Sequence, residues 1–341
     1  MKVAVVNDSP MAVEALRRSL GYNPELEIVW TATNGAEAVS LCASLTPDLV
    51  LMDLIMPGMD GVEATRQIMA RSPCAVLVVT ASIGANSGRV FEAMGHGALD
   101  AVDTPELGLG ENREAAATLL RKIKTISRLI GDRPPRPLRG GSARKVSGER
   151  LIAIGASSGG PTALTKVLSG LPVDLAASVV IVQHIDQQFA AGMADWLSAS
   201  SPWPVRVAVE GDRPAPGTVL LAGTGDHLVF KAADRLGYTA EPVAQVHRPS
   251  VDVFFDSISR HWRGDVLGVL LTGMGRDGAV ALKALRDKGH FTMAQDAASS
   301  AVYGMPKAAA ELKAAVEVLP LAGIAARLVD VVGGKEWRAR G

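Results

Sequence analysis

The feature that most constrains the fold of this chain is a regular alternation of short apolar runs with amphipathic segments. Strands that alternate with helices in this way form a parallel sheet with helices on both faces, because each helix crosses over the sheet to reach the next strand. In the first hundred residues the predicted strands are Lys2–Val6, Ile28–Ala32, Leu49–Met52, Ala75–Val79 and Ala98–Val102, and the predicted helices are Pro10–Leu20, Gly35–Leu45, Gly61–Ala70 and Arg89–Met94.

The same alternation returns after residue 150 and predicts a second doubly wound α/β domain. A chain of 341 residues has room for two such domains, each with its own core. The predicted strands of this second module are Leu151–Gly155, Val179–Gln183, Val205–Val209, Thr218–Ala222 and Val266–Leu271.

Charge indicates where the two modules separate. Residues 1–106 carry 6 Lys and Arg against 13 Asp and Glu, residues 107–150 carry 11 against 4, and residues 151–341 carry 18 of each. The basic stretch holds a helical pattern with apolar residues at Leu119, Ile123 and Ile126, followed by Pro and Gly residues that continue neither a helix nor a strand. The predicted plan is a first domain at 1–106, a basic helical and Pro/Gly-rich linker at 107–149, a second domain at 150–332 and a tail at 333–341.

Several classes of protein are excluded by the composition. No apolar run approaches the ~20 residues needed to span a bilayer, and the N-terminal run ends at Asn7 and Asp8, too early for a signal-peptide core. The two cysteines, Cys42 and Cys74, form no CxxC pair, and the histidines form no HExxH pair. We therefore expect a cytoplasmic protein without direct membrane insertion, disulfide framework or zinc site.

Polar residues follow three predicted strands of the first module, at the edge where parallel sheets bind ligands. Asn7 and Asp8 follow the first strand, Asp53 follows the third and Thr80 follows the fourth. Converging carboxylates favour a hard cation such as Mg²⁺, beside which a carboxylate can attack a phosphoryl group and a hydroxyl can bind it. An equally good interpretation makes Asp8 the cap of the next helix, since Ser9 and the proline after it are typical of a helix start.

Three predicted strand ends of the second module carry the parts of a nucleophilic hydrolase. Ser157 lies in the glycine turn Gly155–Pro161, His184 follows the second strand, and Asp277 lies in a glycine-lined loop after the strand that ends at Leu271. An imidazole can remove a serine proton, a carboxylate can orient the imidazole, and loop N–H groups can bind an oxyanion. Taken singly, each residue is at least as well explained by a structural role. Phosphate or dinucleotide binding is the alternative for the turn, which has neither the GxGxxG spacing nor the Walker ending.

The first module resembles the receiver domain of response regulators over about residues 1–106. The matching motifs are VVNDS at 5–9, LMDLIMPGMDG at 51–61 and VTA at 79–81. The resemblance implies a five-stranded, flavodoxin-like fold in which Asp53 accepts a phosphoryl group. It further implies that Asp8, Asp53 and the Ile55 carbonyl bind Mg²⁺ and that Thr80 is the switch hydroxyl.

Two positions depart from the receiver pattern. Asn7-Asp8 stands where the family usually has two acidic residues, and Thr104 stands where the family has a phosphate-binding lysine. The loss of that cation removes a charge-assisted contact to the phosphoryl group, so the resemblance implies weaker switching.

The second module resembles the catalytic domain of CheB, the chemotaxis protein-glutamate methylesterase family, over about residues 150–330. The matching motifs are IGASSGG at 154–160, VQH at 182–184, LTGMGRDG at 271–278, QD at 295–296 and VYGMP at 302–306. The resemblance implies that Ser157, rather than Ser158, is the nucleophile, that His184 is the general base and acid, and that Asp277 orients it. The Met274 N–H is a weaker candidate for binding the oxyanion.

The order of receiver, linker and esterase also agrees with that family, so the resemblance implies a methylesterase controlled by phosphorylation. Its substrate would be methylated glutamates on the cytoplasmic helices of a chemoreceptor, with glutamine deamidation by the same acyl-enzyme route. A CheA-type histidine kinase would be the phosphodonor, Mg²⁺ would serve the receiver, and the esterase would need no cofactor. Asn7 and Thr104 resemble the form attached to Wsp-type surface-sensing systems.

Two other functions fit parts of the sequence. A non-catalytic regulator would bind a kinase or a receptor through the acidic first module. A nucleic-acid-binding response regulator is supported only by the basic stretch 107–150, which has neither interleaved aromatic residues nor a helix-turn-helix pattern. We therefore expect no nucleic-acid partner.

Overall fold

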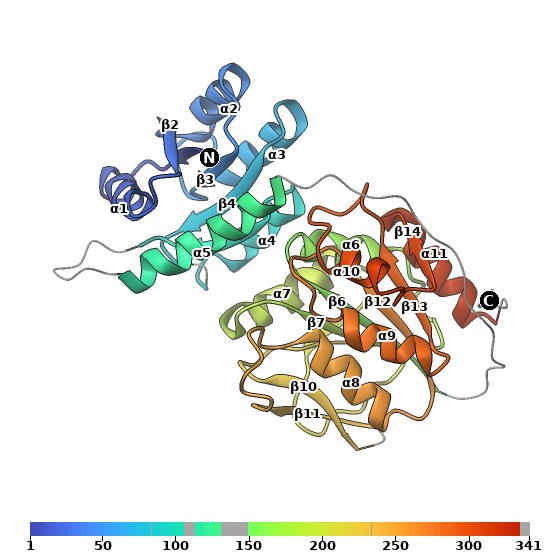
Figure 1. Cartoon of the computed structure of the whole chain (residues 1–341). Helices are drawn as coiled ribbons and strands as arrows, with labels where there is room; N and C mark the ends of the chain where they lie inside the picture. Colours follow the sequence, from blue (N-terminus) through green and yellow to red (C-terminus); the bar gives the residue numbers. More distant parts are fainter. Residues whose placement is uncertain (83, 106–112, 131–148, 233, 335–341) are drawn as a thin grey trace. The chain divides into compact units, whose positions relative to one another are not determined.

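The computed structural model of the protein describes residues 1–82, 84–105, 113–130, 149–232 and 234–334. The chain divides into two compact units, Met1–Arg133 and Pro134–Gly341 (Figure 1). Each unit has its own parallel sheet and its own hydrophobic core.

The first unit is built on a five-stranded parallel sheet with the order β2-β1-β3-β4-β5. This confirms the doubly wound fold predicted for the first module, with strand ends that shift by no more than two residues. The strands are β1 (Lys2–Val6), β2 (Glu27–Ala32), β3 (Leu49–Met52), β4 (Ala75–Thr80) and β5 (Asp100–Asp103). The helices are α1 (Pro10–Gly21), α2 (Gly35–Ser44), α3 (Gly61–Arg71), α4 (Ser87–Gly95) and α5 (Arg113–Ile130).

Helix α5 belongs to the core of the first unit. Its buried residues Leu119, Ile123 and Ile126 share one apolar cluster with Val3 and Val5 of β1. The predicted linker begins at residue 107, yet this helix packs on the sheet because its apolar stripe is removed from water there. The segments 106–112 and 131–148 and most of the predicted tail, 335–341, lie outside the described residues.

The second unit is built on a seven-stranded parallel sheet with the order β14-β13-β12-β6-β7-β9-β8. Its strands are β6 (Arg150–Ala156), β7 (Ser178–Gln183), β8 (Val205–Val207), β9 (Val219–Leu221), β12 (Asp265–Leu270), β13 (Phe291–Gln295) and β14 (Glu317–Leu319). The strands β10 (His227–Ala232) and β11 (Arg235–Thr239) form a separate antiparallel hairpin. The helices are α6 (Gly160–Ser169), α7 (Gln187–Ser200), α8 (Val251–His261), α9 (Ala279–Asp287), α10 (Met305–Glu311) and α11 (Leu321–Val332).

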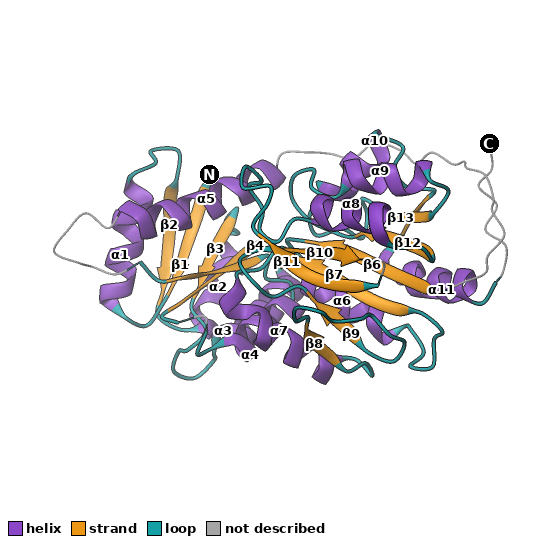
Figure 2. Cartoon of the chain, turned by 90° about the horizontal axis from the view of Figure 1, so that it is seen from below, coloured by secondary structure: helices purple, strands orange, loops and turns teal. Residues whose placement is uncertain are grey.

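Helices cover both faces of the second sheet (Figure 2). Helices α8, α9 and α10 lie on one face, and α6, α7 and α11 lie on the other. Strand β6 lies between β12 and β7, so the chain first extends the sheet on one side of β6 and later on the other. The carboxyl ends of β6 and β12 therefore meet at a topological switch point, where doubly wound folds bind their ligands.

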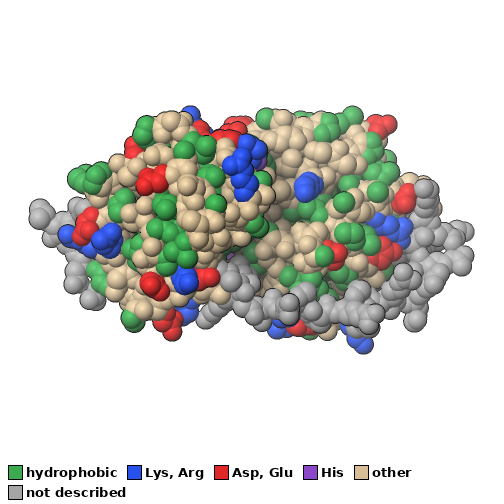
Figure 3. All heavy atoms as spheres, turned by 90° about the horizontal axis from the view of Figure 1, so that it is seen from above, with side chains coloured by type: hydrophobic (Ala, Val, Ile, Leu, Met, Phe, Trp, Pro, Cys, Tyr) green, Lys and Arg blue, Asp and Glu red, His purple; other side chains and the backbone are tan. Residues whose placement is uncertain are grey.

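The described part of the chain contains no helix that is both long and apolar enough to cross a membrane. On the face drawn in Figure 3, acidic and basic side chains are scattered among apolar ones.

Candidate active site

Ser157 and His184 follow two neighbouring strands of the second sheet. Ala156 of β6 pairs in register with Gln183 of β7, and each of the two candidate residues is the next residue along its strand. The N–H of His184 donates to the Ala156 carbonyl at 3.0 Å. The parallel pairing therefore brings the predicted nucleophile and the predicted base to adjacent strand ends.

The backbone of Ser157 is held on both sides. Its N–H donates to the carbonyl of Thr272, in the loop after β12, at 3.0 Å, and its carbonyl accepts from Gln183 Nε2 at 2.9 Å. A Cβ at Gly273 would lie 2.7 Å from the Ser157 Cβ, so only glycine lets the two loops approach this closely. The turn after Ser157 is completed by Gly159, which adopts φ 74°.

His184 and Asp277 form a buried pair. His184 Nε2 lies 2.7 Å from Asp277 Oδ2, and the two side chains are 10% and 3% exposed. Burial alone would raise the pKa of Asp277, but the hydrogen bond and charge of His184 and the amides of α8 outweigh it and lower the pKa to about 2. An ionised carboxylate only accepts hydrogen bonds, so Nε2 carries the imidazole proton.

The Asp277 carboxylate is seated at the N-terminus of α8. Oδ1 accepts from Ser250 Oγ at 2.8 Å and from the Asp252 N–H at 3.1 Å, and Oδ2 accepts from the Val251 N–H at 2.7 Å. With His184 these donors satisfy both oxygens, and the helix terminus favours the negative charge. Groups of the chain itself therefore offset the cost of burying the charged carboxylate.

The other edge of the imidazole is free to act as a base. His184 Nδ1 is buried and has no hydrogen-bond partner among the described residues. The Ser157 hydroxyl likewise makes no hydrogen bond within the described part of the chain, so the structure unites His184 with Asp277 and leaves the serine–histidine contact unformed. The competing Ser158 is tied by its carbonyl, which accepts from the Thr272 hydroxyl at 3.0 Å.

Two residues that contact the pair, Ser250 and His247, lie outside the sequence motifs given above. The signal for Ser250 was its position as the N-cap of α8, where its hydroxyl also accepts from the Val253 N–H at 3.2 Å. No local signal identified His247, whose ring lies against His184.

The predicted receiver residues lie at one edge of the first sheet. Asp53 N–H donates to the carbonyl of Val6, the last residue of β1, at 2.9 Å. Thr104 N–H donates to the Thr80 carbonyl at 2.9 Å, and the Thr80 hydroxyl accepts from Asn86 Nδ2 at 3.1 Å. The strand ends thus bring Asp53 beside β1 and Thr104 beside Thr80.

The cap of α1 is Ser9, whose hydroxyl accepts from the Ala12 N–H at 3.4 Å. Asp8 is therefore not the helix cap, and the capping interpretation of this residue is wrong. Asn7 is buried, and its side-chain oxygen accepts from the Ser9 N–H at 2.8 Å.

Asp53 occupies an unfavourable position for a charged group. Burial raises its pKa, the N–H groups of Ile55 and Leu54 lower it, and the charge of Asp8 raises it again, with a net upward shift. A divalent cation between the two carboxylates would relieve both the burial and the repulsion. The described residues hold no cluster of three or more His, Cys, Asp or Glu side chains suited to a metal.

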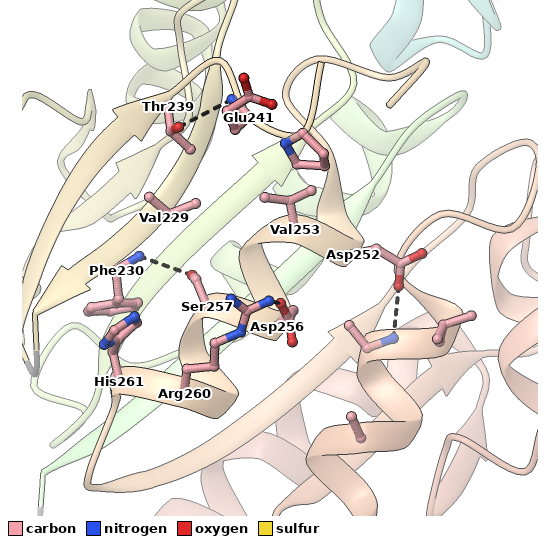
Figure 4. Close-up of a pocket in the computed structure, with 14 residues that line it drawn as sticks. Val229, Phe230, Thr239, Glu241, Asp252, Val253, Asp256, Ser257, Arg260 and His261 are labelled. Carbon is pink, nitrogen blue, oxygen red and sulfur yellow. Dashed lines mark hydrogen bonds and ion pairs between the residues drawn. The ribbon is translucent and has the colours of Figure 1, made fainter. Parts of the chain in front are cut away.

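A separate cavity of about 730 Å³ lies between the β10–β11 hairpin and helices α8 and α9 (Figure 4). On its wall the Asp252 carboxylate accepts from the Ala281 N–H at 2.8 Å. Burial, and to a smaller extent the charge of Asp277, raise the pKa of Asp252. The lining includes neither Ser157, His184 nor Asp277, so the cavity is separate from these three side chains.

A serine beside a buried histidine–carboxylate pair, at the carboxyl edge of a parallel sheet, is the arrangement of an α/β serine hydrolase. Family models agree with both units: the CheB methylesterase model matches residues 152–328, and the response regulator receiver domain model matches residues 3–106. The catalytic domain of the Thermotoga maritima CheB methylesterase is similar in structure, with a TM-score of 0.52 and 30% sequence identity, and covers 54% of this chain and 100% of its own.

Relatives match nearly the whole chain. A Pseudomonas fluorescens protein named protein-glutamate methylesterase/protein-glutamine glutaminase 1 is 61% identical, over 97% of this chain and 99% of its own length. A Pseudomonas putida protein named as the methylesterase/glutaminase of the group 3 operon is 59% identical over the same shares. The chain belongs to the CheB family of protein-glutamate methylesterases that carry a receiver domain.

Proposed function

We propose that this chain hydrolyses glutamate γ-methyl esters on the cytoplasmic helices of a chemoreceptor and deamidates glutamines there by the same route. The observation that carries the proposal is the buried His184–Asp277 pair, because His184 follows the strand next to that of Ser157 and its Nδ1 has no partner among the described residues. The names and full-length similarity of the relatives support the substrate class. Such a substrate requires an enzyme that works in the cytoplasm.

His184 Nδ1 removes the Ser157 hydroxyl proton as Oγ attacks the ester carbon. The Met274 and Ser158 N–H groups have no partner within the described residues and are the donors available to the oxyanion. The imidazolium, stabilised by ionised Asp277, returns its proton to the departing methoxy oxygen, and methanol leaves an acyl-enzyme. A water activated by the same nitrogen then releases the glutamate carboxylate, and with a glutamine substrate ammonia leaves instead of methanol.

The first unit is proposed to accept a phosphoryl group on Asp53 from a CheA-type histidine kinase. Asp8, Asp53 and the Ile55 carbonyl would hold Mg²⁺, which neutralises charge between the carboxylate and the incoming phosphoryl oxygens. Thr80 would donate to the phosphoryl group, since its oxygen already accepts from Asn86 and its proton stays available. Asn7 and Thr104 support an assignment to the Wsp-type form of the family.

We assign α5 to the receiver domain, because its buried residues share the core of the first unit. The esterase begins with β6, and the segment between the two carries no proposed catalytic role. The esterase mechanism uses only side chains and backbone groups of the second unit.

The proposed nucleophile is tested with a methyl-labelled receptor fragment and a measurement of released methanol. We expect Ser157→Ala to abolish nearly all release, because the members of a triad act as a unit. Ser158→Ala is the matched control and should keep a substantial fraction, since the structure engages its carbonyl rather than its hydroxyl. Loss of activity in Ser158→Ala with full activity in Ser157→Ala would refute the assignment.

A further inference from the structure

A second imidazole lies against the proposed base. The ring of His247 stacks on the ring of His184 with centroids 4.2 Å apart and planes within 8° of parallel. His247 comes from the loop 240–249, between β11 and α8, and takes no part in the hydrogen bonds of the triad. The proposed chemistry does not account for this contact.

The loop is braced independently of its histidine. Arg248 Nη2 donates to the Val243 carbonyl at 2.7 Å, and Gln245 Nε2 donates to Ser250 Oγ at 3.2 Å. Ser250 in turn donates to the triad carboxylate. The loop that presents His247 is thus anchored at the same helix start that seats the orienting carboxylate.

A single hydrogen bond fixes one edge of a ring but leaves its plane free to tilt about that bond. The contact between His184 Nε2 and Asp277 is such a bond, and Nδ1 has no partner to hold the opposite edge. A parallel ring at 4.2 Å restricts the tilt, because rotation would bring the two rings into collision. The stack therefore keeps Nδ1 in one direction while the serine contact forms.

The charge state of His247 is compatible with this role. Burial at the contact and the neighbouring His184 lower the pKa of His247, and Asp277 opposes them, with a net downward shift. A neutral ring face also favours the imidazolium that His184 becomes during the reaction.

We propose that His247 is a positioning residue, which holds the plane of the His184 imidazole for proton transfer with Ser157. The inference rests on the proposed function, and it assigns the β11–α8 loop a part in the reaction rate rather than in receptor binding.

The test uses the full chain with two readouts: the rate at which a fluorophosphonate labels Ser157, and the kcat and KM for methanol release. We expect His247→Ala to lower both kcat and the labelling rate by about 10- to 100-fold, with KM changed by less than about twofold. His247→Phe keeps a flat ring and should restore most of both rates. His247→Asn, which has no ring face, should be as slow as the alanine variant and serves as a second truncation.

Val246→Ala is the matched control, because Val246 is the preceding residue of the same loop and is 88% exposed. It should be labelled at the wild-type rate. Wild-type labelling of His247→Ala or His247→Asn, or a failure of His247→Phe to recover, would overturn the inference while leaving Ser157 as the nucleophile. A wild-type protein that is not labelled would refute the proposed function itself.

Discussion

Asp53 and Asp277 both lie in loops that follow a parallel strand, one in each unit, yet their surroundings shift their pKa values in opposite directions. Each follows a strand of a parallel sheet at its carboxyl edge. Asp277 is surrounded by four donors, including His184 and the first turn of α8, and its pKa falls to about 2. Asp53 accepts two backbone N–H groups on one oxygen but faces Asp8, and its pKa rises.

The difference separates a site that the chain completes from one that needs a ligand. Around Asp277 the protein supplies every group that stabilises the negative charge. Around Asp53 the nearby charge is another carboxylate, and the family's lysine is replaced by Thr104. The donors of the esterase edge are thus in place in the chain itself, whereas a bound cation would stabilise the two carboxylates of the receiver edge.

The largest expected contrast is in basal ester hydrolysis. Asp277→Asn should lower kcat by about 10³- to 10⁴-fold, a loss of the size known for this change in a serine protease triad. Asp53→Asn should leave basal hydrolysis without phosphodonor near the wild-type rate. Methanol release by the two full-length variants provides the measurement, and an equal loss in both would contradict the separation of the two sites.

The second contrast is in the free energy of unfolding, which ionisation of Asp277 should raise in the second unit and ionisation of Asp53 should lower in the first. The pKa of Asp277 falls from 3.8 to about 2, so its ionisation stabilises the second unit by about 2 kcal/mol above pH 3.8, and this is lost as the pH falls towards 2. The pKa of Asp53 is raised, so its ionisation destabilises the metal-free first unit at neutral pH, and the effect disappears in acid.

Hydrogen exchange across a urea series, followed separately on peptides from β3 and β12, measures both effects. At pH 7 without Mg²⁺, Asp277→Asn should destabilise the second unit and Asp53→Asn should stabilise the first. Both differences should shrink below pH 3. Destabilisation of the first unit by Asp53→Asn would mean that Asp8 and burial do not dominate its environment.

The smallest expected effect concerns the lysine that Thr104 replaces. Thr104→Lys should strengthen the activation of ester hydrolysis by a small phosphodonor with Mg²⁺, by up to about tenfold, because it restores a charge-assisted contact to the phosphoryl group. The ratio of rates with and without phosphodonor measures the effect. Asp53→Asn in the same background should abolish both phosphorylation by the phosphodonor and activation of ester hydrolysis. An unchanged ratio in a Thr104→Lys protein that is still phosphorylated would show that Thr104 does not limit switching.

Much of this architecture could be predicted from local sequence. The strands β1, β3, β4, β6 and β7 are short apolar runs whose buried character is visible in their residues. By contrast, β13 contains buried Thr292 and Gln295, β14 has three residues, and the β10–β11 hairpin begins with a buried histidine. Polar groups in such strands form hydrogen bonds with partners distant in sequence, as when Gln295 accepts from the Thr272 N–H. A local sequence pattern does not indicate these strands.

The sequence by itself determined which side chains could stand at the edges of the sheets, because a residue that follows a buried parallel strand must emerge there. Ser157, His184, Asp277, Asp8, Asp53 and Thr80 were all identified in this way or by resemblance. Only the tertiary structure decided that Ser9 caps α1, that α8 seats Asp277 on its first turn, and that His247 covers His184. These contacts join segments far apart in the chain or choose between neighbouring residues, and a choice of that kind depends on distances that folding sets.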